Sequence, residues 1–199
     1  MKNLEILLAS ASPRRAEILS SLGIKFTVIR PDVDESSNVK DPEALTRELA
    51  LRKGQEALRM IGGNCDGKLI LSCDTVVYCD GEILGKPEND VDAKRMLRLL
   101  SGKTHKVVSG ICIISDKLCT SAAESTLVTF SPLTDGDIEF LIKNGEALDK
   151  AGAYAVQGLA SVYVEKLTGD YFNVVGLPVN LINRTLTERF GFPLRSLID

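Results

Sequence analysis

The sequence contains one histidine, His105, and no tryptophan among its 199 residues. A metal site built from several histidines is therefore excluded, and a Ser-His-Asp or Cys-His catalytic unit could use only His105. Metal chemistry in this chain would have to rely on oxygen ligands, which favour Mg²⁺ or Mn²⁺ over zinc. Because His105 directly precedes an expected strand, we interpret it as a residue with a structural hydrogen bond.

Other absences limit the class of protein. The five cysteines have no C-x-x-C spacing, and the net charge is −3. No apolar run reaches the ~18 residues that a membrane span requires, and the apolar stretch at the N-terminus is too short for a signal peptide. Binding to a nucleic-acid polymer usually requires a broad basic face. We therefore expect reduced thiols, a cytoplasmic protein, no membrane and no nucleic-acid polymer as partner.

Strand and helix patterns alternate along the chain, with hairpins mixed among them. This organisation predicts an α/β fold with a mixed β-sheet flanked by helices, as one domain over residues 1–199 with two lobes around a cleft. The predicted helices run over residues 13–22, from 42 to the glycine pair 62–63, over 90–100, from 134 to 144 and over 178–190. The predicted strands include residues 4–9, 106–115 and 118–130, and hairpin turns are expected at 80–81 and 169–170.

Arg14 and Arg15 occupy the first turn of a helix that Ser12 and Pro13 are expected to begin. The partial positive charge at this end disfavours each cation by roughly 0.3–1 kcal/mol. An anion bound near Ser10 would reverse the penalty, because backbone N–H groups and guanidinium groups both bind phosphate. The alternative is that both arginines are ordinary solvated side chains.

Asp74 and Thr75 interrupt an apolar run between Leu69 and Cys79. A carboxylate inside a buried strand is costly unless it is paired or binds a metal. One interpretation is that the strand delivers Asp74 into a cleft, where it holds Mg²⁺ or a water molecule. The other is that Asp74 caps a turn or pairs with a nearby arginine.

Several separated segments resemble the Maf family of nucleoside triphosphate pyrophosphatases. These are LASASPRRAEIL, CDTVV, LGKP, LSGKTHKVVSG, LDKAGAYAVQG and YFNVVGLP, which follow the family's order and span nearly the whole chain. The resemblance implies a cytoplasmic enzyme that hydrolyses a nucleoside triphosphate to its monophosphate and diphosphate with a divalent metal cation, Mg²⁺ or Mn²⁺. It also implies a fold similar to that of the inosine triphosphate pyrophosphatases.

The resemblance also implies roles for individual residues. Asp74 corresponds to the catalytic proton acceptor, and Asp74 and Glu35 are the expected metal ligands. The expected substrate-binding residues are Ser10, Arg14, Arg15, Lys53, Thr75, Lys86 and Gln157. Of these, Arg14, Thr75 and Gln157 correspond to positions of substrate specificity.

The segment LDKAGAYAVQG resembles the branch of the family that prefers dTTP and UTP. The Gln157 amide has a donor and an acceptor, which can pair with the N3–H and a neighbouring carbonyl of thymine or uracil. We expect hydrolysis of dTTP and UTP in nucleotide-pool house-cleaning, and a homodimer is compatible with this interpretation. One alternative is a 7-methyl-GTP pyrophosphatase of the same family. The other is a non-enzymatic nucleotide-sensing regulator of cell division, and such a regulator would not need the Asp74 carboxylate to activate water.

Overall fold

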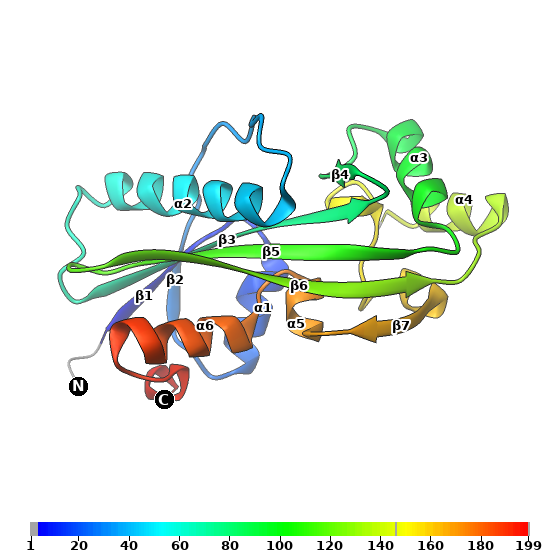
Figure 1. The fold of residues 1–199 in the computed structure, drawn as a ribbon. Coiled ribbons are helices and arrows are strands. Elements are labelled where there is room, and N and C mark those ends of the chain that lie inside the picture. Colours follow the sequence, from blue (N-terminus) through cyan, green and yellow to red (C-terminus); the bar gives the residue numbers. More distant parts are fainter. Residues whose placement is uncertain (1–3, 146, 199) are drawn as a thin grey trace. The chain divides into compact units, whose positions relative to one another are not determined.

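The computed structural model describes residues 4–145 and 147–198 (Figure 1). Residues 1–3, 146 and 199 of the predicted domain lie outside the described residues. The strands are β1 (Glu5–Ala9), β2 (Phe26–Ile29), β3 (Lys68–Cys79), β4 (Glu82–Leu84), β5 (Thr104–Ile114), β6 (Cys119–Phe130) and β7 (Val164–Thr168). The α-helices are α1 (Pro13–Ser21), α2 (Pro42–Met60), α3 (Asp90–Leu100), α4 (Asp135–Lys143), α5 (Tyr171–Val175) and α6 (Val179–Thr185).

Within the described residues these strands form one 7-stranded sheet in the order β2-β1-β3-β5-β6-β7, with β4 paired to β3. Strand β1 runs parallel to β2 and β3, whereas β4 is antiparallel to β3 and β7 is antiparallel to β6. The sheet is therefore mixed and flanked by helices, which confirms the predicted fold class. No helix of residues 4–145 and 147–198 has both the length and the apolar character needed to cross a membrane.

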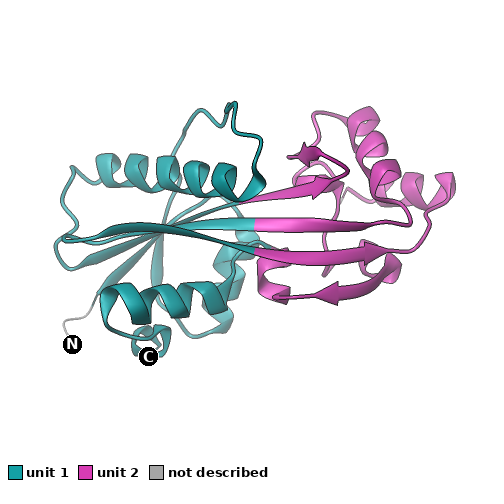
Figure 2. Ribbon diagram, viewed as in Figure 1, with its two compact units in different colours: residues 1–74, 109–124, 176–199 teal, residues 75–108, 125–175 magenta. Residues whose placement is uncertain are grey.

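The chain divides into two compact units (Figure 2). Unit 1 comprises residues 1–74, 109–124 and 176–199, and unit 2 comprises residues 75–108 and 125–175. Strands β3, β5 and β6 each contribute residues to both units. The two units agree with the expectation of two lobes, whereas the cleft stays a prediction.

In unit 1, helices α2 and α6 lie on opposite faces of the sheet (Figure 1). Helix α2 comes close to its face because two positions there lack side chains. A Cβ atom at Gly110 would lie 2.3 Å from the carbonyl oxygen of Thr46, and one at Gly54 would lie 2.9 Å from Ser72 Oγ. Larger residues at these positions would push the helix away from the sheet. The close approach places Lys53, in the middle of α2, beside β3.

Unit 2 has a core formed by apolar side chains of β3 to β7, α3 and α4. Two local sequence patterns in this unit form the structures predicted for them. Asp80 and Gly81 have φ angles of 49° and 87°, so the predicted β3–β4 hairpin is confirmed. Thr134 and Asp137 form the predicted capping box at the start of α4.

The predicted hairpin at Gly169 and Asp170 is wrong. The chain leaves β7 and enters helix α5, because Asp170 Oδ1 accepts hydrogen bonds from the backbone N–H groups of Phe172 at 2.8 Å and Asn173 at 3.3 Å. Asn173 is fully buried, and its Nδ2 donates to the carbonyl of Val107 at 3.0 Å. A capped, anchored helical turn therefore replaces the strand that the apolar pattern indicated.

The last predicted helix, over residues 178–190, is confirmed in its first part by α6. From Leu186 to Phe190 the helix continues with the wider turn of a π-helix and ends at Gly191, which has a φ angle of 79°. Glycine is the residue that adopts this left-handed conformation at least cost, and it is a common helix stop.

His105 lies in a buried aromatic cluster of unit 2 with Phe130 and Tyr154. The residue is 2% exposed, and its Nε2 lies 2.7 Å from the Tyr154 hydroxyl oxygen. The rings meet edge to face, with centroids 5.1 Å apart for Phe130 and 5.4 Å for Tyr154. Burial lowers the pKa of His105 to about 4, so the imidazole is neutral near pH 7. The structural role expected for this histidine is confirmed.

We predict that the His105 cluster makes the fold sensitive to acid. An unfolded histidine binds a proton near pH 6.5, whereas folded His105 does so only near its pKa of about 4. The unfolded state therefore gains stability as the pH falls through this window. We expect His105 alone to lower the free energy of unfolding by about 2 kcal/mol when the pH falls from 7 to 5.

Denaturant titrations of the unaltered protein and of His105→Gln at both pH values measure this contribution. The variant keeps hydrogen-bonding capacity towards Tyr154 but does not titrate, so it should lose less stability on acidification. Because His105 is the only histidine, its ring proton resonances also report its pKa directly. Equal acid dependence in the two proteins, or a measured pKa near 6.5, would contradict the prediction.

Candidate functional site

Asp74 is the last residue of the first segment of unit 1 and lies within β3. Its side chain is 9% exposed, and Oδ1 lies 2.5 Å from Nζ of Lys53. A carboxylate at such a depth requires a partner, because the loss of hydration is expensive. The partner is a lysine from α2. It stands where the second interpretation of the sequence expected a nearby arginine.

Lys53 joins two carboxylates. Its Nζ lies 2.5 Å from Asp74 Oδ1 and 2.7 Å from Glu35 Oε1, and its side chain is 13% exposed. Burial acts to lower the pKa of Lys53, but Asp74 and then Glu35 outweigh it, so the pKa lies above its usual value. Lys53 is therefore a charged ammonium group held between two acidic side chains. The structure brings Lys53, expected to bind substrate, together with Asp74 and Glu35, the two expected metal ligands.

Glu35 belongs to the segment between β2 and α2, and its side chain is 56% exposed. Arg52 holds this segment on α2. Its Nη1 donates to the carbonyls of Asp34 at 2.9 Å and Ser36 at 2.8 Å, which flank Glu35 in sequence. Sequence reasoning missed Arg52, because an arginine on an amphipathic helix is normally a solvated residue and no motif marks this one.

The motif at the start of α1 is built around Ser10. Ser12 occupies the predicted N-cap position, but its hydroxyl makes no capping bond. Instead, the backbone N–H of Ser12 donates to Ser10 Oγ at 3.1 Å. Arg14 is half-buried, whereas Arg15 is only 9% exposed. The two arginines of the motif therefore have different surroundings.

Arg15 extends into the interior of unit 1. Its Nη1 donates to Ser10 Oγ at 3.1 Å and to the carbonyl of Cys73 at 2.7 Å, and its Nε donates to the carbonyl of Gly176 at 2.8 Å. Hydrogen bonds to these acceptors offset part of the free-energy cost of burying a guanidinium group. The prediction that Arg15 binds substrate stays a prediction.

The other predicted binding residues belong to unit 2. Lys86 and Gln157 are exposed and Thr75 is half-buried. The segments that contain Lys86 and Gln157 meet, because the backbone N–H of Gly152 donates to the carbonyl of Gly85 at 3.0 Å. Unit 2 therefore holds two of the recognised motifs side by side.

Glu35 and Asp74 were also predicted to bind a divalent metal. Both carboxylates converge on one cation, the Lys53 ammonium, so they point towards the same place. Among the described residues, no three His, Cys, Asp or Glu side chains come together in a metal site. Two carboxylates suit Mg²⁺ nonetheless, because it usually takes one or two of them and completes its shell with substrate phosphates and water. The residues present fit a metal that arrives with its substrate.

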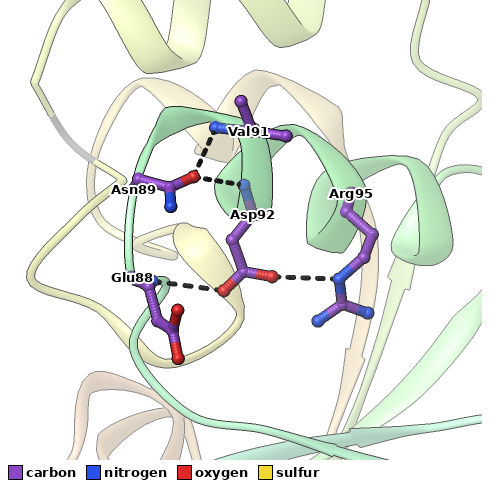
Figure 3. Close-up of a pocket in the computed structure, with 5 residues that line it drawn as sticks. All are labelled: Glu88, Asn89, Val91, Asp92 and Arg95. Carbon is purple, nitrogen blue, oxygen red and sulfur yellow. Dashed lines mark hydrogen bonds and ion pairs between the residues drawn. The ribbon is translucent and has the colours of Figure 1, made fainter.

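A surface depression in unit 2 includes none of the predicted residues. It lies at the start of α3 and is lined by Glu88, Asn89, Val91, Asp92 and Arg95 (Figure 3). Asn89 Oδ1 accepts from the N–H groups of Val91 and Asp92, each at 3.0 Å. Asp92 accepts from Arg95 Nε at 2.9 Å. These bonds are those of an ordinary helix cap and a surface ion pair, and we assign the depression no role.

Comparison with known proteins places this chain in a family. The family described as Maf-like protein matches residues 5–189. The chain is 41% identical over 191 residues to the dTTP/UTP pyrophosphatase of Symbiobacterium thermophilum, with 96% of each chain covered. It is 45% identical over 184 residues to that of Syntrophomonas wolfei, covering 92% of this chain and 96% of the relative.

A third relative has the same name. The dTTP/UTP pyrophosphatase of Thermococcus onnurineus is 42% identical over 186 residues, covering 94% of this chain and 98% of the relative. Among solved structures, the Staphylococcus aureus Ham1 protein gives a TM-score of 0.46 at 16% identity, covering 63% of this chain and 71% of that chain. The family match contains every predicted site residue and extends over both units. The chain belongs to the Maf-like protein family.

Proposed function

We propose that this chain is a nucleoside triphosphate pyrophosphatase that hydrolyses dTTP and UTP to the monophosphate and diphosphate and so cleans the nucleotide pool. The observation that carries the proposal is the cluster of Asp74, Lys53 and Glu35, which places a buried carboxylate next to a cation and a second acid. Support for the substrate comes from relatives 40–45% identical to this chain that are named dTTP/UTP pyrophosphatase.

In this proposal, Asp74 orients the attacking water and accepts its proton, while the α-phosphorus is the site of attack. Lys53 keeps the Asp74 carboxylate in one position and adds positive charge where the phosphates bind. Phosphoryl chemistry depends mostly on such positioning and charge neutralisation. Arg14 and Lys86 bind the phosphates, and Thr75 and Gln157 contact the nucleoside.

A divalent cation, Mg²⁺ or Mn²⁺, is part of the proposal, and Glu35 and Asp74 would hold it. When bound, it would neutralise phosphate charge and activate a water molecule. The chain would act in the cytoplasm on free nucleotides, in keeping with its net charge of −3. A homodimer remains compatible with the proposal.

The alternatives are weaker on specific grounds. A non-enzymatic nucleotide sensor would need the cations but would gain nothing from the buried Asp74 carboxylate at the same place. A 7-methyl-GTP pyrophosphatase would share the chemistry, but the relatives above are named for dTTP and UTP.

We predict that the purified protein with Mg²⁺ or Mn²⁺ converts UTP to UMP and diphosphate in equal amounts. Attack on the α-phosphorus places the water oxygen in UMP, so the reaction in ¹⁸O-water should label UMP and leave diphosphate unlabelled. Mass spectrometry of both products measures this, with a chelator as the control for metal dependence. Release of UDP and orthophosphate would contradict the geometry, and inertness towards every triphosphate would favour the sensor.

We predict that Asp74→Asn lowers turnover by roughly 10²–10⁴-fold, the usual contribution of a general base. The fold should persist, because Lys53 keeps Glu35 as a partner. Nucleotide affinity, measured by calorimetry, should change little. Asp80→Asn is the matched control, since it makes the same chemical change in the β3–β4 turn and should keep full activity. An Asp74→Asn variant with half the parent turnover would show that Asp74 is structural.

We predict that Gln157→Ala narrows the preference for UTP over CTP by about tenfold, the equivalent of about 1.4 kcal/mol for one lost hydrogen bond. Because Gln157 is exposed, the melting temperature should stay the same. Ratios of kcat/KM for the two substrates measure the effect. Gln55→Ala, an exposed glutamine on α2, is the control and should keep the parent preference. An unchanged ratio in Gln157→Ala would exclude Gln157 from base recognition.

A further inference from the structure

Arg15 is a buried cation that donates hydrogen bonds to protein acceptors on Ser10, Cys73 and Gly176. We propose that Arg15 is a positioning residue, which holds Ser10 and the backbone before Asp74 in place, and that it is not a ligand of the triphosphate. The proposal rests on the proposed function and changes the role that the sequence motif suggested for this arginine.

The guanidinium joins three segments of unit 1 that are distant in sequence. From α1 it reaches the carbonyl of Cys73 in β3 at 2.7 Å and the carbonyl of Gly176 at 2.8 Å. The thiol of Cys73 lies 3.2 Å from the same Gly176 oxygen, so the two acceptor segments are also in contact with each other. A planar guanidinium has its N–H groups in fixed directions and can serve several acceptors at once. A lysine at this position would have a single compact charge.

The consequence for Ser10 is an oriented hydroxyl. A serine hydroxyl accepts two hydrogen bonds and donates one. Ser10 Oγ accepts from the N–H of Ser12 at 3.1 Å and from Arg15 Nη1 at 3.1 Å. With both acceptor positions used, the hydroxyl hydrogen is the group that Ser10 presents to an anion. Arg15 thus makes Ser10 a donor towards phosphate without contacting the phosphate.

The consequence for Asp74 is a fixed backbone. Arg15 holds the carbonyl of Cys73, the residue directly before Asp74, while Lys53 holds the Asp74 carboxylate itself at 2.5 Å. The peptide and the side chain are therefore constrained independently. Displacement of a reacting group by about 1 Å can lower a rate by about 100-fold. Loss of Arg15 should therefore affect turnover more than substrate binding.

Steady-state kinetics with UTP and Mn²⁺ separate the two roles of the neighbouring arginines. In Arg15→Lys and Arg15→Ala we expect kcat to fall by about 100-fold while KM stays within about threefold. In Arg14→Ala, the matched control for loss of one charge, we expect KM to rise by about tenfold with kcat nearly unchanged. Added guanidinium ions should partly restore kcat of Arg15→Ala in a saturable way and should not help Arg14→Ala. A raised KM with normal kcat in the Arg15 variants would overturn the proposal.

Amide hydrogen exchange without substrate gives a readout that is independent of activity. In Arg15→Lys, which keeps the charge and guards against failure of the alanine variant to fold, exchange of the Ser12 amide and of residues 72–76 should accelerate. The same amides should exchange at the parent rate in Arg14→Ala. Unchanged exchange in Arg15→Lys would contradict the proposal. Inertness of the unaltered protein towards all triphosphates would instead contradict the proposed function. The exchange measurement would still test whether Arg15 holds the Ser12 amide and residues 72–76 in place.

Discussion

Burial of the Asp74 carboxylate is the constraint on which the rest of unit 1 depends. A charge within a central strand is tolerated only with a close partner, and Lys53 supplies it at 2.5 Å. Lys53 is itself buried, so it needs the second carboxylate of Glu35 at 2.7 Å. Lys53 is the central member of the cluster: its removal would leave the buried Asp74 carboxylate without this charge partner, whereas removal of either acid leaves Lys53 paired with the other.

The backbone around this cluster is arranged to make it possible. Glycines at 54 and 110 let α2 approach β3 and β5 closely, because a Cβ at either position would collide with the neighbouring segment. Arg52 holds the loop that contains Glu35. Arg15 holds the peptide before Asp74 from the side of α1. Asp74 is therefore held through its side chain by α2 and through the preceding peptide by α1, two helices from different parts of the chain.

Much of the fold was predictable because its signals are local. The Asp80-Gly81 turn and the Thr134–Asp137 capping box each depend on residues at most three positions apart. The error at Asp170 has a physical cause. Its carboxylate could cap a helix or sit in a turn, and the choice depended on Asn173, whose burial against Val107 lies outside any local pattern.

The sequence by itself determined the order of the motifs, the absence of a multi-histidine metal site and the identity of Asp74 as an unusual residue in an apolar strand. Only the tertiary structure decided what each charged group faces. Arg14 and Arg15 look equivalent in the sequence, yet Arg15 donates hydrogen bonds to the carbonyls of residues 73 and 176. Lys53 meets Asp74 across 21 positions of the chain. Such contacts depend on how whole helices pack on the sheet, and the spacing of residues along one segment does not contain that information.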